Sequence, residues 1–368
     1  LAQYGNSRLI FIFLIIGIFS KMMNTGKIGN GFIWLSLNLG IRGSAFVVFS
    51  FLASAVISMG AGAPIAALFA VIPIFYPPGI LLGASPAMLT GALISGIFFG
   101  DALSPSSHVI NTTVMIQHDK ATGKPAELLA TLRQRTPYIL LAGAAAMVIF
   151  FIFGAQGGTM GDMAEIEAFS QAKGLLMLIP IAVLLAICFK TGNLFVGLSF
   201  AIVTGLFVGL LGGLFTFSDI VSIDYATSGL KGMIFEGIYG MLDVAVSTIL
   251  LYGLIAVAVS CCSWLLSGKF TGTKRGVEAV VMGGTIVINI LLAGCVLPSI
   301  LMFGDMADRI GQESGISPER RSILLTANAT NFSSIVPINS AFVMGSVTII
   351  NEMVQNHSYL PHVTPFAI

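Results

Sequence analysis

Two apolar segments of this chain are interrupted at matching positions, and this repeat constrains the fold more than any other feature. They are GASPAMLTGALISGIFFGDALSPSSHVINTT (Gly83 to Thr113) and GISPERRSILLTANATNFSSIVPINSAFV (Gly315 to Val343). Each opens G-x-S-P, breaks at small polar residues and a proline, and continues as a second apolar segment. The paired prolines lie 232 positions apart (318 − 86 and 337 − 105), Pro86 with Pro318 and Pro105 with Pro337. Segments broken at corresponding places in two halves are typical of the binding sites of secondary transporters.

An apolar hairpin precedes each interrupted segment. The hairpins run over 44–80 and 277–310, and their turns fall at Gly60-x-x-x-Pro64 and Gly294-x-x-x-Pro298. A glycine at a hairpin tip allows the backbone to approach its neighbours closely. We therefore assign the tips to Gly60, Gly62 and Gly294. Each half then reads as a helix, a re-entrant hairpin and a broken helix.

The scarcity of charge places this chain in a membrane. Of its residues, 56% are hydrophobic and only 9% are charged, whereas a soluble domain carries roughly 25% charged residues. A helix needs about 20 apolar residues to span the bilayer core, and the candidate full spans are 9–23, 138–154, 174–189, 194–215 and 244–266. We predict an all-α polytopic membrane protein, multi-pass in the cell inner (plasma) membrane, with the lipid bilayer as its partner. The net charge of +1 argues against nucleic acid as a partner.

Lysine and arginine residues are concentrated in alternate loops, which predicts an orientation by the positive-inside rule. The loops around 120–135 and 269–275 are basic and are placed in the cytoplasm. The first hairpin then enters from the outside and the second from the inside, so the structural repeats are inverted. We assign 1–155 to the first repeat, which we expect to lack its N-terminal helices, and 156–368 to the second. The sequence leaves the oligomeric state open, a homodimer included.

Asp101 is the first candidate for a functional residue, because it follows a long apolar run in FFGDALSPSS. A charge at the bilayer centre is costly, so an intramembrane carboxylate is a functional candidate by default. Hydroxyl and amide groups follow it at Ser104, Ser107, Asn111 and Thr112. Sodium is a hard cation that binds oxygen ligands, and we predict sodium at Asp101, Ser104 and Ser107. The alternative is an ordinary helix end that leaves the carboxylate in water.

The second break is polar but carries no charge. The residues that we expect to bind an ion or a substrate there are Asn328, Asn331, Ser333, Ser334 and Asn339. A stretch this polar is costly to expose to lipid; the alternative role is to hold packed helices together. Unpaired backbone near the bilayer midplane needs partners, and each break can supply them to the other. We therefore expect the two breaks within about 15 Å of each other, roughly one and a half helix diameters.

His108 is a candidate proton carrier together with Asp101, because histidine titrates near neutral pH. A hydrogen-bonded histidine with a structural role is the alternative. The sequence shows no nucleophile triad, phosphate-binding loop or metal-ligand spacing. We predict that the protein is not an enzyme and that it uses no cofactor apart from transported or coupling Na⁺ and H⁺.

At these motifs the chain resembles the NhaC-type sodium/proton antiporters of a wider ion-transporter superfamily. FFGDALSPSSHVINTT is similar to their G-D-x-x-S-P-x-S-D-T-T-N signature, and IVPINSA is similar to their later P-W-N-x-x-G element. The positions that match the signature are Gly100, Asp101, Ser104, Pro105, Ser107 and Asn111. His108 stands where the family has aspartate, Val109 and Ile110 stand for two threonines, and Ile338 replaces tryptophan.

The resemblance implies sodium coupling and alternating access, and two functional classes stay open. One is a sodium/proton antiporter in which Asp101 binds sodium and protons in turn. The other is a sodium- or proton-coupled carrier of a small carboxylate or amino acid, in which the second break binds the organic part. The missing aspartate at position 108 and the uncharged second break favour the carrier. The motif match favours the antiporter.

Overall fold

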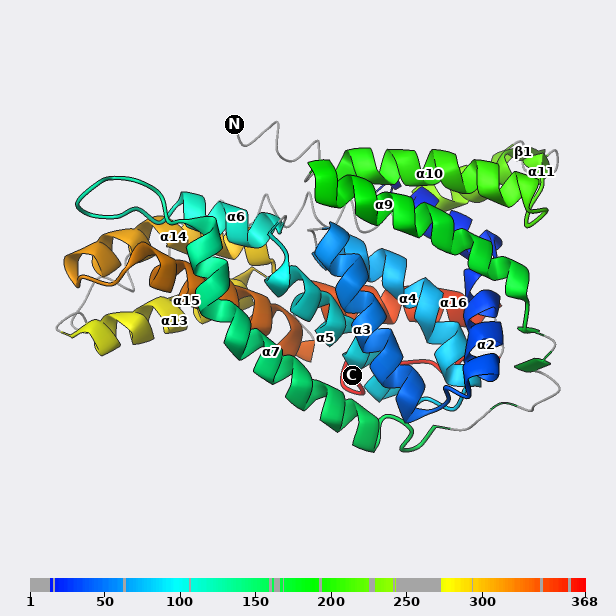
Figure 1. The fold of residues 1–368 in the computed structure, drawn as a ribbon, viewed down its shortest axis with the longest axis horizontal. Helices are drawn as coiled ribbons and strands as arrows, with labels where there is room; N and C mark the ends of the chain where they lie inside the picture. The colour runs from blue at the N-terminus through cyan, green and yellow to red at the C-terminus, as the bar shows by residue number, and fades with distance from the viewer. Residues whose placement is uncertain are drawn as a thin grey trace. The chain divides into compact units, whose positions relative to one another are not determined.

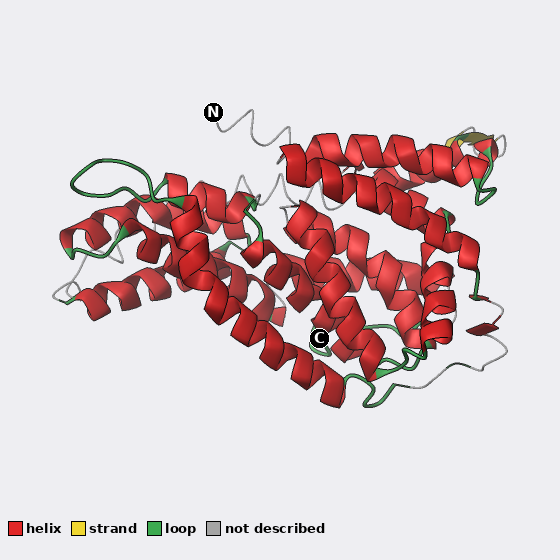
Figure 2. Ribbon diagram, in the orientation of Figure 1, coloured by secondary structure: helices red, strands yellow, loops and turns green. Residues whose placement is uncertain are grey.

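The computed structural model of this chain is almost entirely helical (Figure 2). It describes residues 14–15, 17–61, 64–105, 107–158, 161, 166–167, 169–191, 194–224, 229–240, 242, 273–292, 294–337, 340–356 and 359–368. The elements in Figure 1 are α2 (Ile28–Leu39), α3 (Ser44–Ala61), α4 (Pro64–Leu81), α5 (Pro86–Leu103), α6 (His108–Met115), α7 (Leu128–Phe153), η1 (Ala172–Met177), α9 (Leu178–Thr191), α10 (Leu194–Leu211), α11 (Phe217–Ile220), β1 (Ser222–Asp224), β2 (Gly229–Lys231), α13 (Lys274–Leu291), α14 (Val296–Glu313), α15 (Pro318–Ile335) and α16 (Ala341–Asn356).

Three consecutive helices of the first half are matched by three helices of the same length in the second half. α3, α4 and α5 have 18 residues each, and so have α13, α14 and α15. The starts of α4 and α14 are 232 positions apart (296 − 64), and so are the starts of α5 and α15 (318 − 86). Both halves therefore contain two helices followed by an interrupted helix, and the inverted relation of the two repeats stays a prediction.

The arms of the first hairpin are the apolar helices α3 and α4. At 1.5 Å per residue an 18-residue arm measures about 27 Å, close to the ~30 Å hydrocarbon core. No charged residue interrupts α3 or α4. Neither arm is among the described helices that are long and apolar enough to cross a membrane, and the re-entrant hairpin stays a prediction. In the second hairpin only the first half of α14 is apolar, because Asp305, Asp308, Arg309 and Glu313 lie in its second half.

The chain forms two compact units that do not coincide with the predicted division into 1–155 and 156–368. The first unit contains 1–101, 144–247 and 345–368, and the second contains 102–143 and 248–344. The reason is that the second segment of each interrupted helix packs outside its own half. α6 belongs to the unit of α13, α14 and α15, whereas most of α16 belongs to the unit of α3, α4 and α5.

Glycines let α5 lie directly on the backbone of α3 in the first unit. A Cβ atom at Gly96 would collide with the carbonyl oxygen of Phe51, and one at Gly100 would collide with the backbone of Ala55. Four residues separate the two contacts on each helix, so the two helices run in the same direction. Because glycine lacks a Cβ atom, the two backbones approach more closely here than other residues would permit.

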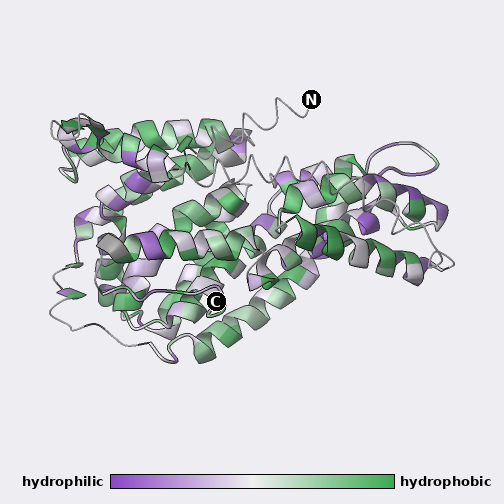
Figure 3. Cartoon of the chain, turned by 180° about the vertical axis from the view of Figure 1, so that it is seen from behind, coloured by the Kyte–Doolittle hydropathy of each residue, from purple (hydrophilic) through white to green (hydrophobic). Residues whose placement is uncertain are grey.

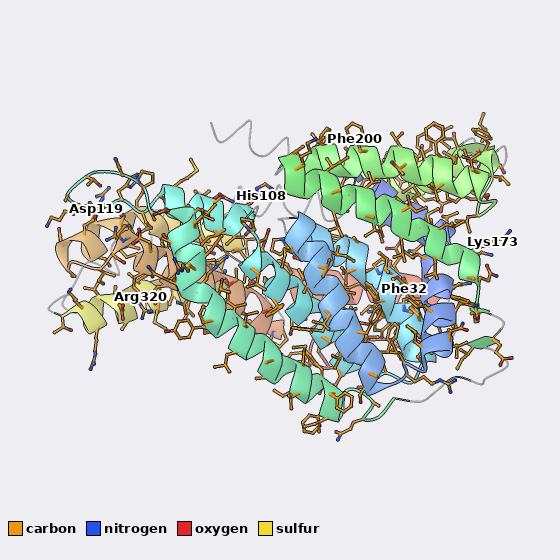
Figure 4. All side chains as sticks on the ribbon, in the orientation of Figure 1. Phe32, His108, Asp119, Lys173, Phe200 and Arg320 are labelled. Atoms are coloured by element: carbon orange, nitrogen blue, oxygen red, sulfur yellow. The ribbon has the colours of Figure 1, made fainter. Side chains whose placement is uncertain are left out.

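An aromatic cluster joins α2, α3 and α4 in the same unit. The ring centroid of Phe32, labelled in Figure 4, lies 4.8 Å from that of Phe75 and 6.0 Å from that of Phe49. Phe49 and Phe75 also meet edge to face, with centroids 6.2 Å apart. These distances are typical of favourable aromatic pairs.

A hydrophobic core joins α13, α14 and α15 in the second unit, where Figure 1 shows them side by side. Its buried members are Val277, Val281, Ile288, Leu292, Phe303, Ala307, Ile316, Leu324 and Leu325. The side chain of Asn289, on α13, contacts both of the other helices. Its side-chain nitrogen donates to the carbonyl oxygen of Ala329 at 3.1 Å and to the hydroxyl of Ser299 at 3.3 Å. One amide group thus links all three helices.

Among the described residues, two helices are long and apolar enough to cross a membrane by length and composition. They are α5 and α7; only 11% of the most apolar window of α7 is buried. Figure 3 shows hydrophobic residues along most of the helices. This pattern agrees with the predicted association with a membrane.

The predicted spans are found with shifted ends. The span 174–189 corresponds to η1 and α9, 194–215 corresponds to α10, and 138–154 is the second part of the longer α7. Span 9–23 is described from residue 14 onward, where 14–15 and 17–25 are helical. Span 244–266 lies outside the described residues. The structure adds α2 and the small antiparallel pair of β1 and β2, which the sequence did not predict.

Candidate ion-binding site

Pro105 and Ser107 form the first break, between α5 and α6. Pro105 has no backbone N–H and cannot continue the helical hydrogen-bond ladder. Ser107 then starts α6, because its hydroxyl accepts a hydrogen bond from the backbone N–H of Ile110 at 3.4 Å. A serine in this position satisfies one of the N–H groups that the start of a helix leaves without a partner. The predicted position of the break is confirmed.

Asn111, in the first turn of α6, forms hydrogen bonds with the backbone of the break. Its side-chain nitrogen donates to the carbonyl oxygen of Pro105 at 2.9 Å and to that of Ser107 at 2.7 Å. The amide hydrogens of Asn111 are therefore engaged by the break itself. Thr112, the next predicted ligand, is half-buried as Asn111 is.

The three predicted sodium ligands are all buried. Asp101 is 2% exposed, Ser104 0% and Ser107 1%. Asp101 is the last residue of the first segment of the first unit, and the two serines belong to the second unit. Burial of oxygen ligands away from bulk water suits a hard cation, which must exchange its hydration shell for them. That these oxygens share one sodium ion stays a prediction, and so does the separation of the two breaks.

The second break lies nearer the C-terminus than the sequence predicted. The polar stretch that begins at Thr326 is helical as far as Ile335, and α15 ends there, just before Pro337. The reason is that its polar side chains bond to their own helix. Asn328 donates to the carbonyl oxygen of Leu324 at 2.7 Å. Such bonds to the preceding turn are compatible with a helix, and no proline or glycine interrupts the stretch before Pro337.

The predicted ligands of α15 fall on different sides of the helix. Asn328 and Ser333 are buried, Ser334 is half-buried, and Asn331 is exposed. Asn339 lies outside the described residues. Only the first two therefore face the interior of the second unit.

The hydroxyl groups of α15 present oxygen lone pairs rather than hydrogens. Ser333 donates its hydrogen to the carbonyl oxygen of Thr330 at 2.6 Å, and Ser334 donates to that of Asn331 at 3.0 Å. A hydroxyl has one hydrogen and two lone pairs. Once the hydrogen bonds to the helix, the group can only accept a hydrogen bond or bind a cation.

The structure brings α6 and the polar helix α15 together within the second unit. The hydroxyl of Thr326 lies 3.2 Å from that of Thr113, and both residues are buried. Thr113 donates its own hydrogen to the carbonyl oxygen of Val109 at 2.7 Å. The segment that follows the first break therefore contacts the polar segment that precedes the second.

The glycines predicted at the hairpin tips have different roles. Gly294 has a φ of 72°, which is favourable for glycine and strained for other residues, and its N–H donates to the carbonyl oxygen of Asn289 at 2.9 Å. Gly60 lies inside the last turn of α3, so its assignment to the tip is corrected; the helix continues to Ala61. Gly62 lies outside the described residues.

His108, which is labelled in Figure 4, is exposed at the first position of α6. Exposure is compatible both with a proton carrier and with a hydrogen-bonded histidine in a structural role. The role of proton carrier stays a prediction.

A buried arginine network in the second unit was missed by the sequence analysis. Arg321 is 1% exposed. Its guanidinium donates to Asp308 Oδ1 at 2.9 Å, to Gln117 Oε1 at 3.0 Å, and to the carbonyl oxygens of His118 and Ile316. These bonds join the segment after α6 to α14 and α15. The only sequence signal was the Arg320–Arg321 pair beside an apolar segment, which does not indicate which residue is buried.

No protein-family model matches this chain, and no curated protein matches its sequence. The resemblance to the NhaC-type antiporters therefore rests on the residues of its two motifs.

Proposed function

We propose that this chain is a multi-pass transporter of the inner membrane that exchanges sodium for protons by alternating access, as the NhaC-type antiporters do. The observation that carries the proposal is the burial of Asp101. Its carboxyl is 2% exposed at the end of α5, a helix long and apolar enough to cross a membrane. Placing a carboxylate in an apolar environment costs free energy, so a buried carboxylate is expected to have a function.

Asp101 would bind a proton or a sodium ion, but not both, because each neutralises the same carboxylate. When sodium is bound, Ser104 and Ser107 would add hydroxyl oxygens. Binding of a proton would release the ion. Competition for one carboxylate couples the two fluxes without any further group.

The state of the hydroxyl and amide hydrogens favours a cation over an organic anion as cargo. A carboxylate substrate needs donors, but both amide hydrogens of Asn111, one of the two of Asn328 and the hydroxyl hydrogen of Ser333 already bond to backbone carbonyls. Arg321, the buried cation of the second unit, is held by four acceptors. What these groups offer to a ligand is chiefly oxygen lone pairs, which suit sodium.

The decisive experiment compares Asp101→Asn with Asp119→Asn in proteoliposomes. An imposed sodium gradient is applied, and proton movement is followed with an internal pH dye. We expect the Asp101 variant to lose sodium-driven proton flux completely, while it keeps the elution volume and helical content of the wild type. Asp119 lies in the exposed turn after α6, so its variant controls for loss of one negative charge.

Unchanged flux and pH dependence in Asp101→Asn would refute the assignment of the coupling site. A panel of labelled amino acids and small carboxylates is tested on the same liposomes. Sodium-dependent uptake of one of them, without sodium/proton exchange by the wild type, would instead identify the carrier.

A further inference from the structure

The first unit contains a row of buried serines whose hydroxyls the fold does not satisfy. Ser50, Ser54 and Ser58 recur every fourth residue of α3, and each is 0% exposed. The hydroxyl of Ser54 bonds to the carbonyl oxygen of Ser50. The hydroxyls of Ser50 and Ser58 have no hydrogen-bond partner among the described residues. Buried polar groups are nearly always paired with protein or water.

Tyr76 of α4 gives a second, independent observation of the same kind. Its side chain is 0% exposed, and its hydroxyl likewise finds no partner within the described part of the chain. A buried tyrosine hydroxyl normally has a hydrogen-bond partner. Two neighbouring helices of one unit therefore carry buried hydroxyls that lack partners.

Helix geometry places Tyr76 on the same side as the serine row. Phe49 and Phe75 face each other across α3 and α4, with ring centroids 6.2 Å apart. The two helices are antiparallel, since only residues 62–63 separate them. The next residue on each helix, Ser50 on α3 and Tyr76 on α4, is rotated by about 100° around the helix axis from this contact. In an antiparallel pair both rotations lead to the same side, so Ser50 and Tyr76 point to one groove.

The serine row leads toward Asp101. A Cβ atom at Gly96 of α5 would touch the Cβ of Ser54 at 3.0 Å, so α5 covers the serine side of α3. Because α3 and α5 run in the same direction, Ser58 lies one turn further along α3 than Ser54, near the level of Asp101 on α5. Consecutive serines are about 6 Å apart along the helix axis, which is about twice a hydrogen-bond length. A single bridging water molecule would span such an interval.

We infer that Ser50, Ser54, Ser58 and Tyr76 line a file of buried water that conducts protons to and from Asp101. The inference rests on the proposed function of Asp101 and extends it by a pathway. A proton that leaves the Asp101 carboxyl passes to the nearest water, and each further water accepts one proton and releases another. The hydroxyls of Ser50, Ser58 and Tyr76 can each donate to one water and accept from another, whereas Ser54, which donates to the carbonyl oxygen of Ser50, can only accept.

Radiolytic hydroxyl-radical footprinting of the wild-type protein tests the water directly. Radicals formed from a bound water label the side chain next to it, even where bulk solvent cannot reach. We expect labelling of Tyr76, whereas Phe75, 1% exposed and the adjacent residue, serves as the dry control. Labelling of Tyr76 no greater than that of Phe75 would overturn the inference. This readout does not depend on transport.

Proton flux tests the connection to Asp101. Ser58→Ala removes one hydroxyl, and we expect proton flux at least tenfold slower with an unchanged or lower unfolding temperature. At a dry site the same variant would remove an unsatisfied group, so its unfolding temperature would rise and its flux would stay normal. That result would refute the pathway. If Tyr76 is labelled but Asp101→Asn leaves transport intact, the proposed function fails while the water file stands.

Discussion

The triplet α3, α4 and α5 and the triplet α13, α14 and α15 share their helix lengths but differ in charge. The first triplet contains one charged residue, Asp101, whereas the second contains ten. The ten are Lys274, Arg275, Glu278, Asp305, Asp308, Arg309, Glu313, Glu319, Arg320 and Arg321. The two triplets therefore have the same helix lengths, but they differ in how much lipid contact their charges permit. The second triplet carries too much charge to face lipid on every side.

The contacts that hold the helices of each triplet together also differ. In the first, Gly96 and Gly100 let α5 lie against the backbone of α3, so dispersion contacts dominate. In the second, the guanidinium of Arg321 and the amide of Asn289 reach across helices to specific acceptors. The first arrangement depends on shape, and the second depends on hydrogen bonds between partners in fixed positions.

The strongest way to break the second triplet is to remove its buried cation. Arg321→Met removes the arginine partner of the Asp308 carboxylate, which is 13% exposed. Among the described residues, the carboxylate then keeps only the hydrogen bonds from the backbone of His118 and the side chain of Gln312 and its contact with the His118 ring. Loss of one member of a buried pair costs about 3–5 kcal/mol. We expect that loss in a detergent unfolding titration followed by circular dichroism. Hydrogen exchange should accelerate in 296–335 and stay unchanged in 44–81.

Arg320→Met is the matched control for this prediction. Arg320 pairs with Glu278 at 2.9 Å, but its side chain is 50% exposed. An exposed pair contributes about 0–1 kcal/mol. Equal losses for the two variants would show that burial of Arg321 does not determine the stability of the second unit.

The first triplet should be sensitive to shape instead of charge. Gly96→Ala places a methyl group against the carbonyl oxygen of Phe51, and overpacking of this kind costs about 1–3 kcal/mol. Gly91→Ala on the same helix meets no atom within 4 Å and should be neutral or slightly stabilising. The same unfolding titration measures both. Destabilisation by Gly91→Ala, or none by Gly96→Ala, would contradict the close contact.

The smallest expected effect concerns an acid-sensitive turn in each unit. The backbone N–H and hydroxyl of Thr122 donate to Asp119, and this lowers the pKa of its carboxyl below the ordinary value. The corresponding bonds from Thr216 lower the pKa of Asp219 in the first unit. A lowered folded-state pKa means that the stabilisation is present above the unfolded pKa of about 3.9 and is lost as pH falls through the folded value.

Hydrogen exchange of 119–124 and 216–220 should therefore be protected at pH 5–7 and lose protection below about pH 4. Asp119→Asn should remove the pH dependence of the first segment and leave that of the second. If both segments respond to this one substitution, the two turns do not titrate independently.

Local chemistry in the sequence explains where the interrupted helices begin and where the first one breaks. Pro86 and Pro318 occupy first helical positions, which proline favours, and Pro105 cannot continue a helix. The end of α15 was misplaced for a local reason too. Its hydroxyl and amide groups are common in loops, but they can also bond to the preceding turn, and sequence alone does not choose between these states.

The sequence analysis missed the short helix α2 because packing against a distant segment, and not helical propensity, stabilises it. Gly29 and Gly31 weaken its helical pattern, but a Cβ atom at Gly31 would meet the backbone N of Leu175 at 2.5 Å. The helix is thus stabilised by close contact with η1, a segment far along the chain. Intrinsic propensity cannot report such a contact.

The sequence by itself determined the helical class, the starts of the interrupted helices and the position of the first break, because prolines and apolar runs act over neighbouring residues. Only the tertiary structure decided that Arg321 pairs with Asp308 and Gln117, that α6 and most of α16 pack outside their own halves, and that the hydroxyls of Ser50, Ser58 and Tyr76 find no partner among the residues that the structure describes. These features depend on which surfaces meet after the chain has folded. Hydrogen bonds that span 13 or 204 positions leave no periodic trace in the sequence.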